Sequence, residues 1–269
     1  TPRMASYKTI QAQTSDNSII KPSELIDVVE LTPLKLVDRR IYNWLIGNAW
    51  DQIDQDIEHA IEKSELRGTN KDNERLDDSI GRLMGARVRV KLERDGMPYV
   101  RSFSLLEQVD EPVRKDGLIY YRFPQKLREL IQNSNIFARL QKDVMLSLSS
   151  KYALAVYEML QKRRNLKHQW SETFQLDEMR ALLGVPKNKL TAYKNFKKRA
   201  LVPSVDEVNG LADYGVKFVE VKKGRAVVAI TISWWRKNED ELKQAFQELR
   251  QPRIGRKARL SGKTETLIF

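Results

Sequence analysis

The chain has 269 residues, 41% of them hydrophobic, and it carries 48 Lys and Arg against 36 Asp and Glu, a formal net charge of +12. This length predicts two domains with ordinary buried cores, and the lack of cysteine excludes disulfides and cysteine-ligated zinc or iron–sulfur sites. The excess of positive charge favours a polyanionic partner, either nucleic acid or an anionic membrane surface.

Residues 1–22 are polar and show no periodicity, so we expect a flexible N-terminal arm. They also lack the apolar core of a signal peptide. No run in the sequence reaches the roughly 18 apolar residues that a membrane span needs. We therefore expect a cytoplasmic protein.

Residues 23–146 are expected to form a first domain. Between residues 31 and 50, apolar side chains recur at spacings of three and four, which is typical of an amphipathic helix with Pro33 in its first turn. A second helix is predicted over 76–84, and the alternation of apolar and charged residues over 87–93 predicts a half-buried strand. A turn, two further strands and a short helix complete the domain.

Residues 147–252 are expected to form a second domain of similar order, followed by a basic tail over 253–269. The predicted elements are a helix over 147–164, a short helix over 174–185 capped by Asp177, a helix over 191–209, a hairpin over 214–235 that turns at Lys223 and Gly224, and a closing helix over 238–250. Pro203 is expected to kink the third helix or to end it near Val202.

The order helix, short helix, turn, helix and hairpin is that of a winged helix. Its helix-turn-helix places the second of the two helices in the DNA major groove. The order occurs loosely in the first half of the chain and clearly in the second. We therefore predict an α+β fold of two tandem winged-helix domains, each with helices and a small antiparallel sheet, of which the second makes the main contact with double-stranded DNA.

Residues 191–209 would then be the recognition helix, and six Lys and Arg residues with no acidic residue lie between 187 and 199. Lys194, Lys197 and Lys198 stand at i, i+3 and i+4, so they share one helix face and are expected to hold phosphates as point charges. Base reading would fall to neighbouring polar residues, and the hairpin tip adds positive charge. The candidate contacts are Lys187, Asn188, Lys189, Thr191, Tyr193, Lys194, Asn195, Lys197, Lys198, Arg199, Lys222, Lys223 and Arg225.

The same helix has an apolar side, because Phe196, Ala200 and Leu201 lie largely opposite the lysines and are expected to pack on the domain core. Arg199 is the candidate for a bidentate contact with guanine. A charge run is in many proteins only a solvated face. Here its place on the helix that would enter a groove favours DNA.

Basic residues also gather in the first domain, but interleaved acidic residues weaken their field. The candidates for phosphate contact there are Lys71, Arg75, Arg82, Arg87 and Arg89. Phosphate contact and solvated surface both stay open for these residues. For the tail, a non-specific DNA arm and a solubilising segment both stay open.

The sequence carries no constellation typical of catalysis, of a metal site or of a cofactor site. The motif SGKT at 261–264 matches the end of a phosphate-binding loop, but Lys257 occupies the position of the required glycine. The only histidines, His59 and His168, are isolated, and the acidic run over 51–56 is interpreted as a solvated or inter-domain face. We therefore expect a protein that is not an enzyme.

A linked set of motifs runs through residues 149–232. It consists of a Ser-Lys-Tyr helix ending in Tyr-Glu, a Leu-x-x-x-Arg-x-x-Leu-Gly helix, a Tyr-x-x-Phe-Lys-Lys-Arg helix running to an Asn, and a Gly-Arg hairpin. The residues of the set are Ser150, Lys151, Tyr152, Tyr157, Glu158, Leu176, Arg180, Leu183, Gly184, Tyr193, Phe196, Lys197, Lys198, Arg199, Asn209, Gly224 and Arg225. This set resembles the iteron-binding plasmid replication initiators, and the first half resembles them in residues 31–46 and in element order.

The resemblance implies a protein that binds directly repeated sites at a plasmid origin and opens replication there. It implies a second domain that reads a major groove and a first domain that contacts the adjoining half of the repeat and carries a dimer interface. It also implies monomers on the repeats, dimers that repress the protein's own promoter, and recruitment of the host replication initiator and helicase machinery. A dedicated transcriptional repressor is the alternative within DNA binding, and an RNA- or membrane-binding scaffold is the alternative outside it.

Overall fold

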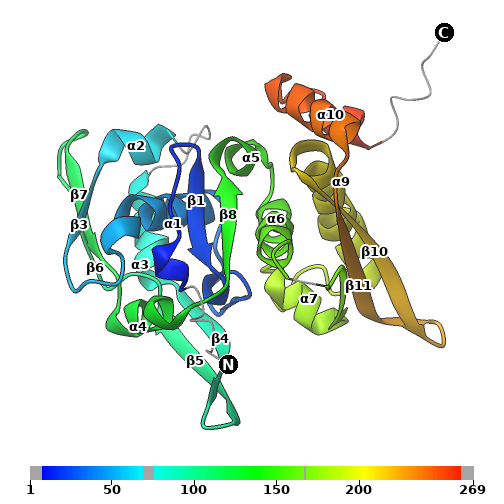
Figure 1. Ribbon diagram of the computed structural model, residues 1–269, viewed down its shortest axis with the longest axis horizontal. Coiled ribbons are helices and arrows are strands. Elements are labelled where there is room, and N and C mark those ends of the chain that lie inside the picture. The colour runs from blue at the N-terminus through cyan, green and yellow to red at the C-terminus, as the bar shows by residue number, and fades with distance from the viewer. Residues whose placement is uncertain (1–7, 69–75, 167, 262–269) are drawn as a thin grey trace, which may run out of the picture. The chain divides into compact units, whose positions relative to one another are not determined.

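The computed structural model describes residues 8–68, 76–166 and 168–261, and the chain divides into two compact units, Thr1–Gln141 and Lys142–Phe269 (Figure 1). The first unit ends before the predicted boundary at residue 146. Helix α5 (Lys142–Ser147) belongs to the second unit, because the carbonyls of its last two residues accept hydrogen bonds from Arg253 and Arg256 of that unit. Within the described ranges, no helix is long and apolar enough to cross a membrane.

The first unit combines short helices with small antiparallel sheets. Its described helices are η1 (Thr9–Gln11), η2 (Ser23–Leu25), α1 (Leu36–Ala49), η3 (Trp50–Gln52), α2 (Lys63–Gly68), α3 (Leu76–Gly85) and α4 (Gln125–Asn133). Its strands pair as β1 (Ser18–Pro22) with β8 (Phe137–Gln141), as β2 (Val29–Glu30)–β4 (Arg87–Arg94)–β5 (Met97–Ser104), and as β3 (His59–Glu62)–β7 (Leu118–Arg122)–β6 (Gln108–Asp110). The predicted helix before the β4–β5 hairpin is confirmed.

The expected flexible arm is wrong for residues 18–22. They form strand β1, which is buried along its whole length and pairs antiparallel with β8, Ser18 opposite Gln141. Ile19 lies against α1, where a Cβ added to Gly47 would come within 3.0 Å of its Cγ1. The strand is short and its partner is distant in the sequence, so no local periodicity indicated it.

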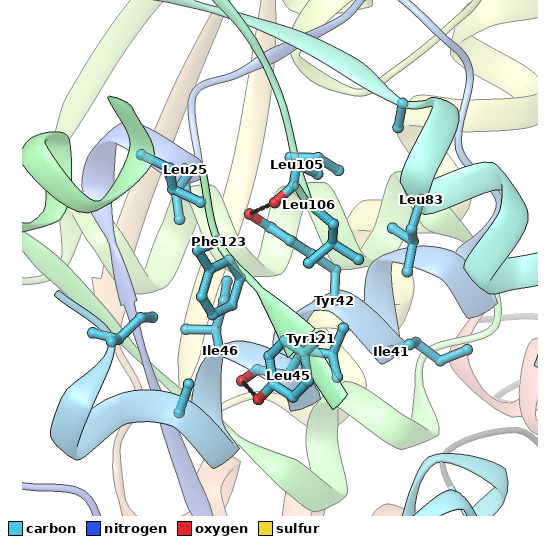
Figure 2. Close-up of a cluster of buried hydrophobic side chains, with 14 of the residues drawn as sticks. Leu25, Ile41, Tyr42, Leu45, Ile46, Leu83, Leu105, Leu106, Tyr121 and Phe123 are labelled. Carbon is cyan, nitrogen blue, oxygen red and sulfur yellow. Dashed lines mark hydrogen bonds between the residues drawn. The ribbon is translucent and has the colours of Figure 1, made fainter. Parts of the chain in front are cut away.

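Helix α1 begins one residue after Lys35, whose backbone N–H donates to the carboxylate of Asp38 over 2.8 Å. Pro33 therefore lies before the helix and not in its first turn. Figure 2 shows the apolar face of α1 in the core of the first unit. There the buried hydroxyls of Tyr42 and Tyr121 donate to the carbonyls of Leu105 and Leu45 over 3.3 and 2.7 Å, which satisfies two polar groups that burial would otherwise penalise.

The second unit has the helix and hairpin order that the sequence predicted. Its described elements are α5, α6 (Lys151–Arg163), β9 (Ser171–Gln175), α7 (Leu176–Leu182), α8 (Tyr193–Phe196), η4 (Lys197–Leu201), α9 (Val202–Leu211), β10 (Tyr214–Lys223), β11 (Ala226–Arg236), α10 (Glu239–Arg250) and α11 (Arg256–Leu260). Strand β11 is central in a sheet of order β10-β11-β9. Because β9 runs straight into α7, Gln175 is the N-cap and the predicted cap at Asp177 is wrong.

The sequence predicts that Pro203 kinks the recognition helix or ends it near Val202, and the second of these two outcomes is wrong. Residues 193–211 run without a break through α8, the π-helical turn η4 and α9. Proline lacks the backbone N–H that an α-helix interior needs. Just before Pro203 the chain widens to a π turn, in which the backbone N–H of Val202 donates to the carbonyl of Lys197. The hydroxyl of Ser204 donates to the carbonyl of Ala200 over 2.6 Å, so that carbonyl is satisfied inside the core.

The basic tail is packed where the structure describes it, up to residue 261. Helix α11 packs against α10 through two arginines. Arg256 and Arg259 both donate to the carboxylate of Glu248, and Arg256 is buried. Leu260 lies against Gly210 of α9, where an added Cβ would come within 2.3 Å of its side chain. The tail therefore begins as part of the second unit and not at residue 253 as a separate segment.

Candidate nucleic-acid interface

The recognition helix, residues 193–211, presents two different sides. Phe196, Ala200 and Leu201 are fully buried, as predicted, and they anchor the helix in the core of the second unit. On its first two turns Lys194, Asn195, Lys198 and Arg199 are exposed. A helix that is fixed by an apolar side and bears exposed cations and an amide on the other can contact phosphates and base edges.

Lys197 does not stand free beside Lys194 and Lys198, as the helical spacing predicted. Its ammonium group lies 2.6 Å from the carboxylate of Glu220 on β10 and 5.9 Å from the ring centroid of Phe218. The spacing of residues along the helix gives no sign of this carboxylate, because it lies on another element. Lys194, Lys198 and Arg199 are therefore the exposed cations of this helix that Glu220 does not neutralise.

Tyr193 is also held by Glu220, because its hydroxyl donates to the same carboxylate oxygen over 2.8 Å. Burial, together with the accepting carboxylate, raises the pKa of Tyr193 well above its ordinary value of 10.0, so it stays a neutral donor. The hydrogen bond from Lys197 and, to a smaller extent, the one from Tyr193 lower the pKa of Glu220 below its ordinary value of 4.5. At neutral pH this contact joins a carboxylate, an ammonium group and a phenol.

The turn before the recognition helix carries Lys187, Asn188, Lys189 and Thr191, all exposed. Its backbone is held by Arg180 of α7, whose guanidinium donates to the carbonyl of Lys189 over 2.7 Å and to that of Leu190. Leu190 has a positive φ of 48°, which is uncommon for a residue with a side chain, so the turn needs such support. Arg180 belongs to the Leu-x-x-x-Arg-x-x-Leu-Gly motif, but it is not among the DNA contacts that the sequence predicts.

The hairpin β10–β11, here called the wing, extends the basic surface. Lys222, Lys223 and Arg225 surround its exposed turn, where Gly224 has a φ of +63° that glycine adopts without strain. The ammonium group of Lys222 lies 3.6 Å from the carboxylate of Glu220. The wing therefore contributes both cations and the carboxylate that contacts the recognition helix.

The candidates in the first unit have different surroundings. Arg82 forms a bidentate pair with Asp38, with its Nε and Nη2 both 2.8 Å from the two carboxylate oxygens, and Asp38 is fully buried. This pair joins α3 to the start of α1. We therefore interpret Arg82 as a structural residue and not as the phosphate contact for which it was a candidate. Arg87 and Arg89 are exposed on β4 and stay candidates. Lys71 and Arg75 lie outside the described residues.

The acidic run of the first unit takes part in ion pairs at its end. Asp56 lies 2.8 Å from Arg122 and 2.9 Å from Arg128. In the part of the chain that the structure describes, no group of three His, Cys, Asp or Glu side chains has the arrangement of a metal site. We therefore interpret Asp56 as a partner of these arginines.

Comparisons with known proteins bear on the fold and the family. Residues 18–161 match the family described as "Initiator Replication protein, WH1", and residues 175–234 match "Initiator Rep protein, WH2". Among solved structures, the chain is similar to a crystal structure of "Pi initiator protein in complex with iteron DNA", with a TM-score of 0.55 and 15% identity, over 85% of this chain and 100% of that chain. A search of curated proteins found no match.

The structural likeness supports the predicted fold of two tandem winged-helix domains, and at 15% identity it supports the fold alone. The first family match spans more than half of the chain, and the second contains the whole recognition helix and most of the wing. The chain belongs to the family of initiator replication proteins, with a WH1 and a WH2 domain in tandem.

Proposed function

We propose that this initiator protein binds directly repeated sites in double-stranded DNA, the iterons of a plasmid origin, and promotes opening of that origin. The observation that carries the proposal is the exposed row Lys194, Lys198 and Arg199 on a helix whose other side is anchored in the core. Family membership supports the same function, and the solved structure of similar fold is that of an initiator protein in complex with iteron DNA.

The surface fits a phosphate backbone better than it fits an isolated small anion. Its cations lie on the turn at Lys187 and Lys189, on the recognition helix and on the wing, so they are spread over three elements. A helix in the major groove with a basic turn and a basic hairpin beside it would contact phosphates on both sides of the base pairs that it reads. In this arrangement the lysines supply affinity, and Asn195 and Arg199 supply base contacts.

Several parts of the proposal extend beyond the DNA contact. We propose that the first domain contacts the adjoining half of each repeat through Arg87 and Arg89 and also mediates dimerisation. We further propose that monomers occupy the repeats, that dimers repress the protein's own promoter, and that the bound protein recruits the host replication initiator and helicase machinery. It would act in the bacterial cytoplasm by assembly on DNA and not by catalysis.

The test is footprinting followed by an unwinding assay on the origin of the replicon that encodes the protein. We expect periodic protection over direct repeats and, on supercoiled DNA, permanganate-reactive thymines in the adjacent A·T-rich segment. Protection of a promoter without thymine reactivity at the origin would favour a dedicated repressor. A preference for RNA or for anionic vesicles over duplex DNA would overturn the proposal.

A further inference from the structure

Glu220 stands out on the proposed DNA-binding surface because of its charge. It is the single acidic residue in the two segments that form this surface, 187–199 and 214–226. Its side chain is mostly buried, with 18% exposed, between the recognition helix and the wing. A carboxylate on a surface that faces phosphates opposes binding, so its position there calls for an explanation.

The contacts of Glu220 come from both elements. One carboxylate oxygen accepts from the Tyr193 hydroxyl over 2.8 Å and from the Lys197 ammonium group over 2.6 Å, and the other lies 3.6 Å from the ammonium group of Lys222. Lys197 and Lys222 remain 43% and 57% exposed, and ion pairs of such exposure add little to stability. Stability of the fold alone therefore does not account for the arrangement.

Two consequences of these contacts concern DNA. The carboxylate neutralises Lys197, so that this lysine does not attract the backbone of every sequence equally. It also fixes the phenol of Tyr193 at the start of the recognition helix, where a side chain of defined position can discriminate between base pairs. Phosphate contacts carry no sequence information, whereas base contacts do.

On the basis of the proposed DNA binding, we infer that Glu220 is a specificity-determining positioning residue, which holds Tyr193 and Lys197 in place and limits binding to non-cognate DNA. Its removal frees Lys197 for a phosphate contact that every duplex offers. Affinity for unrelated DNA then rises, while the preference for the cognate site falls. The expected change in that preference is about tenfold, comparable to the loss of one base-pair contact.

The experiment uses the full chain and a randomised duplex library, from which the wild-type protein selects its preferred site. Fluorescence anisotropy then gives the affinity for the selected duplex and for its scrambled counterpart over a range of salt concentrations. The variants are Glu220→Gln and Glu220→Ala. The glutamine keeps an acceptor for the Tyr193 hydroxyl and removes the charge, whereas the alanine removes both. Glu239→Gln, which removes the same charge from an exposed position on α10, is the matched control.

For Glu220→Gln we expect tighter binding to the scrambled duplex and a salt dependence steeper by about 0.9, the value for one added phosphate contact. Glu220→Ala should lose still more preference, because Tyr193 is released as well. In a Lys197→Ala background, Glu220→Gln should steepen the salt dependence less, because it then releases only the more distant and more exposed Lys222. Glu239→Gln should behave like the wild type in the ratio of the two affinities.

The outcomes separate this inference from the proposed function. A wild-type protein that selects no sequence would overturn the proposed function. A wild-type protein that selects a site, with unchanged preference and salt dependence in both Glu220 variants, would overturn the inference alone. Tyr193→Phe provides a second route if the Glu220 variants unfold, because it removes only the hydroxyl. It should lower the preference for the selected duplex without changing the salt dependence, and an unchanged preference would contradict the positioning role.

Discussion

Arg180 stacks on Phe196, with its guanidinium carbon 5.4 Å from the centroid of the ring. The same guanidinium donates to two carbonyls of the turn between them, so one side chain joins α7, the turn and the first turn of the recognition helix. The ring is fully buried, which makes it a fixed support for the cation. The position of the turn on the proposed DNA surface therefore depends on the arginine.

We expect Arg180→Lys to weaken binding to all duplexes by about tenfold and to lower stability by about 1.5–3 kcal/mol, the range for hydrogen bonds to a charged group. A lysine cannot donate to both carbonyls and stack on the ring at the same time. Anisotropy on the selected and scrambled duplexes, together with urea unfolding, measures both effects. Arg236→Lys at the exposed end of β11 is the control. Lower stability with unchanged affinity would mean that the turn does not contact DNA.

Lys194→Ala and Lys198→Ala should each flatten the salt dependence of binding by about 0.9, because each removes one phosphate contact. Lys197→Ala should change it less, since the charge of Lys197 is already balanced by Glu220 at 2.6 Å. The slope of the logarithm of affinity against the logarithm of salt concentration gives the comparison. Equal slopes for all three variants would show that Lys197 leaves Glu220 when DNA binds.

Arg199→Ala should relax the base preference at one position of the site. A bidentate contact with guanine discriminates against other bases by about 1–3 kcal/mol, and the exposed position of Arg199 suits it to such a contact. Selection from a randomised duplex library by the variant and the wild type measures the preference position by position. A uniform loss of affinity, with the preferred sequence unchanged, would instead place the arginine on a phosphate.

Much of the fold was predictable because its periodic elements are local. The alternation after Gly85 indicated strand β4, and the spacing of Phe196, Ala200 and Leu201 indicated the buried side of the recognition helix. Strand β1 was missed because its partner β8 is more than a hundred residues away in the sequence. Its apolar residues follow one another without the alternation that marks a half-buried strand.

The residue types of the candidate site were predictable from the sequence, but the ion pairs that they form were not. Spacing alone placed Lys197 with the free lysines, although a carboxylate on another element neutralises it. The sequence likewise predicts Arg82 as a candidate for phosphate contact, although Asp38 at the start of α1 binds it. In both cases the partner lies far away in the sequence, and the fold alone brings the two charges together.

Arg82→Ala should destabilise the first unit by about 3 kcal/mol without changing the salt dependence of DNA binding. Its removal leaves the fully buried carboxylate of Asp38 without its cation, and an unpaired buried charge is costly. Urea unfolding measures the stability, and anisotropy measures the salt dependence. Arg87→Ala, at an exposed position on β4, should change the stability by no more than about 0.5 kcal/mol. A flatter salt dependence for Arg82→Ala would restore this residue as a phosphate contact.

The contact between α10 and α11 should make stability depend on pH. Hydrogen bonds from Arg259, at 2.6 and 2.9 Å, and from Arg256, at 3.1 Å, lower the pKa of Glu248 below its ordinary value of 4.5. The unfolded chain therefore takes up a proton first as the pH falls, so the stabilisation is present above about 4.5 and is lost as the pH falls through the lowered pKa.

Glu248→Gln should accordingly reduce the free energy of unfolding by about 1–3 kcal/mol at neutral pH, and its difference from the wild type should shrink in acid. Urea unfolding of both proteins from neutral pH down into the acid range below pH 4.5 tests this, since the stabilisation is lost as the pH falls through the lowered pKa of Glu248. Glu239→Gln on the same helix, at an exposed position, should show no such convergence. A difference that stays constant at every pH would mean that the arginines stabilise Glu248 through packing and not through its charge.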